Sequence, residues 1–312
     1  MAGSIEALEE RLARGETILL DGGTGTELER RGVPMVEGAW CGLANFTHPA
    51  TVREVHEAYL NAGADLVIAN SFASSRHMLE PVGCGGRAAE GCRIAVRLAR
   101  EAVARAARGR PVAVAGSLST ARPVIPGTDR QDPAFALSLE EEAANSRQVA
   151  EALAEAGADL IVLEMIADLD RGPAALEAAL STGLPVWLGL SVARDEEGRV
   201  TSYRAPLALE ELLDFYTARP IAVLGVMHSS IEDCDAALPI LRQRWPGPIM
   251  VYPESGYFEA PHWRFAETAP EDFAEVGAGW VEQGVEIVGG CCGIGPEHIA
   301  ALARRLGRPA EG

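Results

Sequence analysis

Two adjacent cysteines near the C-terminus, Cys291 and Cys292, have the most distinctive chemistry in this chain. They follow the apolar run 285–288 and are flanked by glycines. A disulfide between neighbouring residues is awkward, because their Cα atoms lie ~3.8 Å apart whereas a relaxed disulfide prefers ~5.5 Å. Two thiolates on one soft metal ion are easier to accommodate. The pair therefore favours a zinc site, and a pair of small buried hydrophobic side chains is the alternative.

His228 ends another apolar run, 222–228, and is the third candidate metal ligand. A catalytic zinc takes three protein ligands and leaves one coordination position open. We therefore predict a site formed by His228, Cys291 and Cys292, with room for one incoming group. The alternative for His228 is an ordinary hydrogen-bonded residue at the end of a strand.

Two carboxylates, Asp21 and Glu164, also stand at the ends of apolar runs. They are candidates to bind an ammonium group, to act as acid and base, or to ligate the metal. Ordinary ion pairs with nearby arginines are the alternative. Gly22 and Gly23 follow Asp21, and glycine lets the backbone approach a ligand closely. A tight turn would explain the same two glycines.

Further polar residues follow apolar runs, and we assign Asn70, Ser71 and Glu254 to substrate binding. Trp40 and Trp263 lie in predicted loops, which either cover a site or are packed down by these side chains. The remaining histidines fall in predicted helices or loops, where we expect most of them to be solvated; these are His48, His56, His77, His262 and His298.

Eight short apolar runs alternate with helical patterns along the chain. The runs are apolar on both faces, which is typical of a parallel sheet covered on both sides. Eight such units predict one (β/α)8 TIM barrel, an α/β fold that forms a single domain over residues 1–312. A doubly wound open sheet is the alternative. The runs are 18–21, 65–72, 112–118, 159–165, 186–192, 222–228, 249–254 and 286–292.

In such a barrel the active site lies at the C-terminal ends of the strands. The candidate residues named above end or follow these runs, so we expect them to meet at one rim. The sixth and eighth runs would lie two strands apart there, close enough to share an ion. Three long connections, 32–50, 74–86 and 119–136, follow run ends and should build the catalytic mouth.

The composition limits the partners of the protein. A formal charge of −18 disfavours binding to nucleic acid and to anionic membranes. No apolar run approaches the ~20 residues of a membrane helix, and the N-terminus has no signal-peptide core. Six cysteines without a disulfide-like spacing indicate reduced thiols. We expect a cytoplasmic protein that binds small molecules; homo-oligomers are possible, because barrels often pair through their outer helices.

A series of motifs resembles the homocysteine S-methyltransferase family over nearly the whole chain. The most specific is the closing motif, residues 289–293 with 296–299, which contains both adjacent cysteines. The others are individually modest, but they occur in the family's order: 21–28, Trp40 with Pro49, His56, 61–65, 70–74, 115–117, 156–164 and 252–256.

The resemblance implies a barrel with zinc at its mouth. In this family a thiol amino acid completes the zinc site, and zinc lowers the pKa of that thiol. The sulfur then attacks a methyl group on a sulfonium or quaternary ammonium donor. Asp21 and Glu164 match family positions that hold the amino group. We therefore predict a zinc-dependent S-methyltransferase that converts homocysteine to methionine.

Two positions depart from the family pattern. The family's sixth strand ends in Asn-Cys, whereas this chain has Met227-His228, and Glu254 replaces the usual Asn. A Cys2His zinc site remains chemically reasonable, although its bound thiolate should be less nucleophilic. Another thiol acceptor or a more reactive donor would also fit. The alternative functions are a zinc hydrolase or lyase with Glu164 or Glu254 as general base, and a non-catalytic zinc- or metabolite-binding homologue.

Overall fold

The computed structural model describes residues 4–203, 207–266 and 268–308, and it places all eight predicted runs in one parallel sheet. The observed strands are shorter than the runs, because the polar residues at the run ends leave the hydrogen-bonded ladder. They are β1 (Ile18–Leu19), β2 (Leu66–Ile68), β3 (Ala113–Ser119), β4 (Leu160–Ile166), β5 (Val186–Leu190), β8 (Val223–Met227), β9 (Ile249–Tyr252) and β12 (Ile287–Val288).

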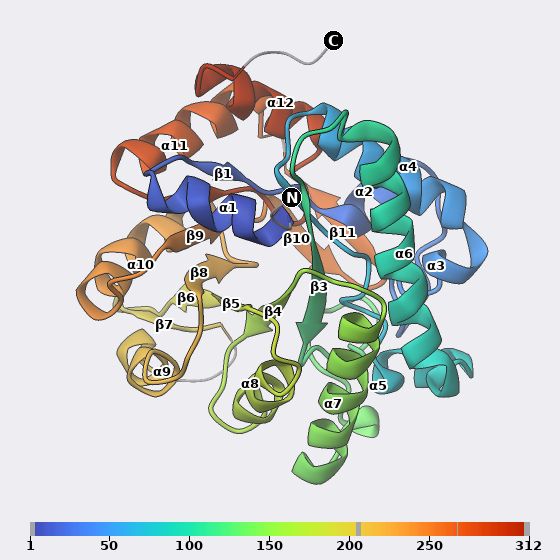
Figure 1. Cartoon of the computed structure of the whole chain (residues 1–312). Helices are drawn as coiled ribbons and strands as arrows, with labels where there is room; N and C mark the ends of the chain where they lie inside the picture. Colours follow the sequence, from blue (N-terminus) through green and yellow to red (C-terminus); the bar gives the residue numbers. More distant parts are fainter. Residues whose placement is uncertain (1–3, 204–206, 267, 309–312) are drawn as a thin grey trace.

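The hydrogen-bonded order of the strands is β1–β12–β9–β8–β5–β4–β3–β2. A parallel bridge between Leu20 and Leu66 joins the two ends of this order. The sheet therefore closes into a barrel, as Figure 1 shows, and the predicted TIM barrel is confirmed. Closure excludes the doubly wound open sheet. Only β9 separates β8 from β12, so the ends that carry His228 and Cys291 lie two strands apart, as predicted.

Helices surround the barrel (Figure 1). Their first turns follow local sequence signals: Ser138 and Glu141 form a capping box at the start of α7, and proline begins α4, α11 and α12. The helices are α2 (Thr24–Arg30), α4 (Pro49–Asn61), α6 (Ala88–Ala106), α7 (Leu139–Glu155), α8 (Gly172–Leu180), α9 (Leu209–Tyr216), α10 (Ile231–Arg244), α11 (Pro270–Glu282) and α12 (Pro296–Arg305).

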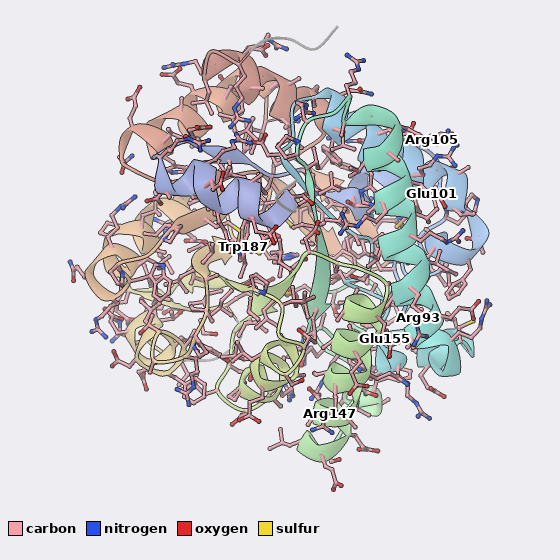
Figure 2. The ribbon with its side chains drawn as sticks, in the orientation of Figure 1. Arg93, Glu101, Arg105, Arg147, Glu155 and Trp187 are labelled. Atoms are coloured by element: carbon pink, nitrogen blue, oxygen red, sulfur yellow. The ribbon has the colours of Figure 1, made fainter. Side chains whose placement is uncertain are left out.

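The N-terminal helix α1 (Ser4–Ala13) lies across one end of the barrel (Figure 1). Its Leu8 is fully buried in the same apolar cluster as Ile18 and Leu20. Trp187, labelled in Figure 2, fills the barrel interior as part of this cluster. Because α1 and these side chains close the N-terminal end, a ligand must enter from the opposite rim.

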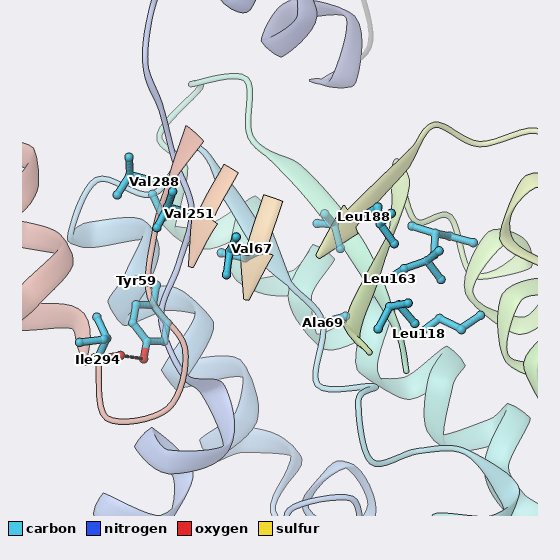
Figure 3. Close-up of a cluster of buried hydrophobic side chains, with 14 of the residues drawn as sticks. Tyr59, Val67, Ala69, Leu118, Leu163, Leu188, Val251, Val288 and Ile294 are labelled. Carbon is cyan, nitrogen blue, oxygen red and sulfur yellow. Dashed lines mark hydrogen bonds between the residues drawn. The ribbon is translucent and has the colours of Figure 1, made fainter. Parts of the chain in front are cut away.

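A second apolar layer lies between the sheet and the helices (Figure 3). Val67, Leu163 and Leu188 belong to this layer, whereas their strand neighbours belong to the interior cluster. The strands are therefore buried on both faces, as their sequence predicts. In Figure 3 the Tyr59 hydroxyl donates to the carbonyl of Ile294 at 3.1 Å, which ties α4 to the loop after β12. On the surface, Arg93 and Glu155 link α6 to α7 (Figure 2).

The three long connections carry short elements, among them α3 (Ala44–Thr47), α5 (Arg76–Leu79) and 3-10 turns at 80–82, 85–87 and 133–135. Two hairpins were not predicted. They are β6 (Val192–Arg194) with β7 (Val200–Ser202), and β10 (Gly256–Glu259) with β11 (His262–Phe265). In the described part of the chain, no helix is both long and apolar enough to cross a membrane.

Candidate active site

The two adjacent cysteines lie in a tightly fixed loop after β12. The amide of Cys291 donates to the carbonyl of Pro253 at 2.6 Å, and the carbonyl of Cys292 accepts from the amide of Ser255 at 2.8 Å. Gly293 has a φ of +84°, and a Cβ there would lie 2.0 Å from the carbonyl oxygen of Ser255. Glycine is therefore required directly after the pair. The two sulfurs are free thiols 3.7 Å apart and are almost fully buried.

His228 follows β8 and is held by contacts on three sides. Its φ is +50°, an uncommon conformation for a residue other than glycine. Its ring stacks on Phe72 with centroids 5.3 Å apart. Nδ1 lies 3.2 Å from the sulfur of Cys291, and Nε2 lies 3.2 Å from Oε2 of Glu164. The fold therefore brings His228, the cysteine pair and Glu164 into one cluster.

The distances within this cluster suit a tetrahedral metal ion. Two sulfurs bound at ~2.3 Å to one zinc lie ~3.8 Å apart, and the two cysteine sulfurs are 3.7 Å apart. A sulfur and an imidazole nitrogen on the same ion lie ~3.5 Å apart, compared with 3.2 Å between Cys291 and His228. Across the described residues, no three His, Cys, Asp or Glu side chains already form a metal-binding group. The donor atoms thus fit zinc in type and closely in spacing.

Burial dominates the electrostatics of the cluster. It raises the pKa of the Cys291 thiol well above its usual value, and the contact with Cys292 adds to this. Burial alone would lower the pKa of His228, but the neighbouring Cys291 and Glu164 hold that pKa well above its usual value. Buried thiolates need a nearby positive charge. A divalent cation would supply it.

Asp21 lies behind the site wall. Its carboxylate is fully buried and accepts from the amide of Ile68 at 2.8 Å and from the hydroxyl of Tyr252 at 3.1 Å. Burial raises the pKa of Asp21 well above its usual value. Tyr252 and Glu164 line the cavity next to the cysteines, whereas Asp21 lines neither cavity at the mouth.

A small cavity of about 50 Å³ lies beside the cysteine pair. All three predicted metal ligands line it, together with Gly22, Gly23, Asn70 and Glu164. Most of the predicted substrate-binding residues therefore share one cavity with the predicted metal ligands. The remaining lining residues are Thr24, Gly25, Trp40, Cys41, Ile68, Ala69, Phe72 and Tyr252.

The other two predicted substrate-binding residues lie elsewhere. The hydroxyl of Ser71 donates to the carbonyl of Ser117 at 2.8 Å and accepts from its amide at 2.9 Å, so it ties β3 to the end of β2. Ser71 lines neither cavity at the mouth. Glu254 lines the larger of the two, described next.

A larger cavity of about 440 Å³ adjoins the small one, and Trp40, Phe72, His228 and Cys292 line both. All three long connections contribute to it, as predicted. Trp40 packs edge-on against Phe72 and against Phe258, with ring centroids 6.1 and 6.0 Å apart.

Sequence reasoning missed several residues that shape these cavities. Phe258 reaches the larger cavity from the β10–β11 hairpin, which had no detectable turn signal. Tyr252 stood within a family motif, and this motif was the available signal. Arg122 lay in a long loop with nothing to distinguish it from other arginines.

The fold and these residues define a barrel protein with a thiol–imidazole centre at its mouth. The family model described as homocysteine S-methyltransferase matches residues 18–306. The chain therefore belongs to the homocysteine S-methyltransferase family. This membership confirms the family resemblance and the prediction of a methyltransferase.

Similar proteins cover almost the entire chain. Homocysteine S-methyltransferase YbgG of Bacillus subtilis is 30% identical and covers 93% of this chain and 95% of its own length. Homocysteine S-methyltransferase of Escherichia coli is 29% identical, with 96% and 98% covered. The crystal structure of MmuM, a homocysteine methyltransferase from Escherichia coli, in its metallated form superposes with a TM-score of 0.76 at 26% identity, covering 97% of this chain and 100% of that one.

Proposed function

We propose that this protein is a zinc-dependent methyltransferase that transfers a methyl group from a small sulfonium or quaternary ammonium donor to homocysteine, giving methionine. The observation that carries the proposal is the position of Cys291, Cys292 and His228, with two sulfurs 3.7 Å apart and the imidazole 3.2 Å from one of them. Family membership and the metallated form of MmuM support it.

His228, Cys291 and Cys292 would hold the zinc ion. When bound, zinc lowers the pKa of a thiol in its open position and so provides a thiolate at neutral pH. All six cysteines are free, which agrees with the reduced thiols of a cytoplasmic enzyme.

The small cavity is proposed to receive the acceptor. Glu164 lines it, and only Oε2 of this carboxylate is engaged, by His228. Among the described residues, none forms a hydrogen bond with Oε1, which leaves that oxygen for an ammonium group. Asp21 adds negative charge from behind Tyr252. The backbone of Gly22 and Gly23 forms another part of the cavity wall.

The larger cavity is proposed to receive the donor. Aromatic faces attract cations, and Trp40, Phe72 and Phe258 line this space beside the metal candidates. The acceptor sulfur donates an electron pair to the methyl carbon. The bond between that carbon and the donor sulfur or nitrogen breaks, its pair stays with the leaving atom, and the positive charge of the donor is neutralised.

The test is methionine formation by metal-replete protein given homocysteine and a panel of donors that includes S-methylmethionine and betaine. Cys292→Ser is the control, because it removes one proposed ligand while conserving size. Methionine from the wild type and none from the variant is the expected result.

A folded, zinc-loaded protein that transfers no methyl group to homocysteine from any donor would count against the proposal and favour the non-catalytic alternative. Donor cleavage without a thiol would favour the hydrolase. Homocysteine should also slow alkylation of the site cysteines, and equal alkylation rates with and without it would argue against this acceptor.

A further inference from the structure

Arg122 is a buried cation in the wall of the larger cavity. It lies in the long connection after β3 and is 7% exposed. Among the described residues that line this cavity, it is the only arginine or lysine. Burying a guanidinium costs free energy unless its donors are satisfied. This position therefore needs an explanation.

The protein satisfies only part of this guanidinium. One nitrogen, Nη2, donates to Oε1 of Glu142 on α7. The same oxygen lies 3.2 Å from Nε of Arg171, so two arginines share one acceptor. Arg171 has a second carboxylate, Asp168, at 3.7 Å. Arg122 has no second carboxylate among the described residues.

A guanidinium has five N–H donors in a fixed planar arrangement. Within the described part of the chain, the hydrogen bonds of Arg122 go to Glu142 alone, and its buried Nε has no partner. Buried donors are nearly always paired with protein, water or ligand. A carboxylate is the group that matches this arrangement best, because it accepts two parallel N–H bonds.

The location of Arg122 selects which substrate would carry that carboxylate. Arg122 lines the larger cavity and does not line the small one beside the cysteine pair. Three acidic residues, Asp129, Glu254 and Glu259, line other parts of the larger cavity and would repel an anion there. An anionic group in this cavity is therefore favoured only next to Arg122.

We propose that Arg122 is the carboxylate-binding residue of the donor site, so that the donor is zwitterionic. Its onium group would lie at the aromatic side chains and its carboxylate at Arg122. That the ligand is the methyl donor rests on the proposed function. Carboxylate binding in the larger cavity does not, because it needs no methyl transfer.

Calorimetry without a thiol acceptor tests carboxylate binding alone. The probes are S-methylmethionine and its primary amide, which keep the sulfonium and the shape but differ in charge. A charge-assisted pair predicts that the wild type binds the acid ~10- to 100-fold more tightly. Arg122→Gln should remove most of that preference. Arg171→Gln is the matched control, because it also removes one partner of Glu142 but should retain the preference.

Equal affinity of the wild type for acid and amide would overturn the proposal, even if Arg122→Gln does not fold. Loss of the preference in both variants would overturn it as well, and would make the Arg122–Glu142–Arg171 cluster a structural support. Normal methyl transfer with no acid preference leaves the proposed function intact and removes only this inference. Acid preference without any methyl transfer does the reverse.

Discussion

Nε2 of His228 lies 3.2 Å from Oε2 of Glu164, while Nδ1 of the same ring lies 3.2 Å from the sulfur of Cys291. The carboxylate orients the ring because it accepts an N–H from Nε2. The lone pair of Nδ1 then faces the cysteine pair. Carboxylates that fix the tautomer of a metal-binding histidine are common partners in zinc sites. Glu164 therefore has two proposed roles, which are positioning of His228 and contact with the substrate amino group.

Glu164→Gln is expected to weaken zinc binding ~10- to 100-fold, because the amide no longer favours one ring orientation. Competition with a chromophoric chelator measures this affinity without any turnover. The matched background is His228→Cys, which has no imidazole for Glu164 to orient. In that background the Glu164 substitution should leave zinc affinity unchanged and raise only the KM for homocysteine. An equal loss of zinc affinity in both backgrounds would contradict the positioning role.

The second prediction concerns the third ligand. Freshly purified reduced protein should contain about one zinc per chain, His228→Ala and Cys291→Ser should lose most of it, and His228→Cys should retain it. Cobalt substitution gives an independent spectroscopic readout, because each thiolate adds charge-transfer absorption. That band should strengthen in His228→Cys. Full zinc occupancy in His228→Ala would remove His228 from the ligand set.

Local patterns predicted the fold well. Each barrel strand is a short apolar run followed by a helical pattern, so a single stretch of chain contains the whole signal. The predicted metal ligands also emerged correctly as neighbours, because barrel topology places strand ends on one rim. Cys291 and His228 are 63 positions apart in sequence, yet their side chains are in contact.

What the sequence did not reveal depends on contacts between distant segments. Asp21 stands at a strand end like Glu164, but Tyr252 separates it from the cavity. His56 was expected to be solvated and is 0% exposed, because its helix packs that face against the barrel. Arg122 acquires its position only when α7 supplies Glu142. No local pattern encodes these pairings.

The third prediction concerns the β10–β11 hairpin, which carries Phe258 into the larger cavity. Glu29 on α2 holds this hairpin, since Oε1 contacts Nδ1 of His262 at 2.7 Å and Oε2 accepts from the amide of Trp263 at 3.1 Å. Glu29→Ala should release the hairpin and raise the KM for the donor several-fold, with zinc content unchanged. Arg264→Gln is the control, because it removes only the exposed pair with Glu259. Equal donor KM values for Glu29→Ala and wild type would show that Glu29 does not shape the donor site.

The fourth prediction concerns His56, whose two ring nitrogens are buried without a hydrogen-bond partner. Burial lowers the pKa of His56 from 6.5 to about 4. Between these values the unfolded chain binds a proton that the folded protein does not, so the free energy of unfolding must fall as pH decreases. At pH 5 the loss is about 2 kcal/mol relative to neutral pH.

His56→Leu should remove this pH dependence and stabilise the protein at pH 5, because it also removes two unsatisfied polar atoms. His56→Gln should remove the same pH dependence while it retains a buried polar group, so it should be less stable than His56→Leu at every pH. Urea unfolding of the three proteins at pH 7.5 and pH 5 measures these differences. If the wild type and His56→Leu lose the same free energy of unfolding between those pH values, His56 takes up its proton equally in the folded and unfolded states, and its burial has no role in acid stability.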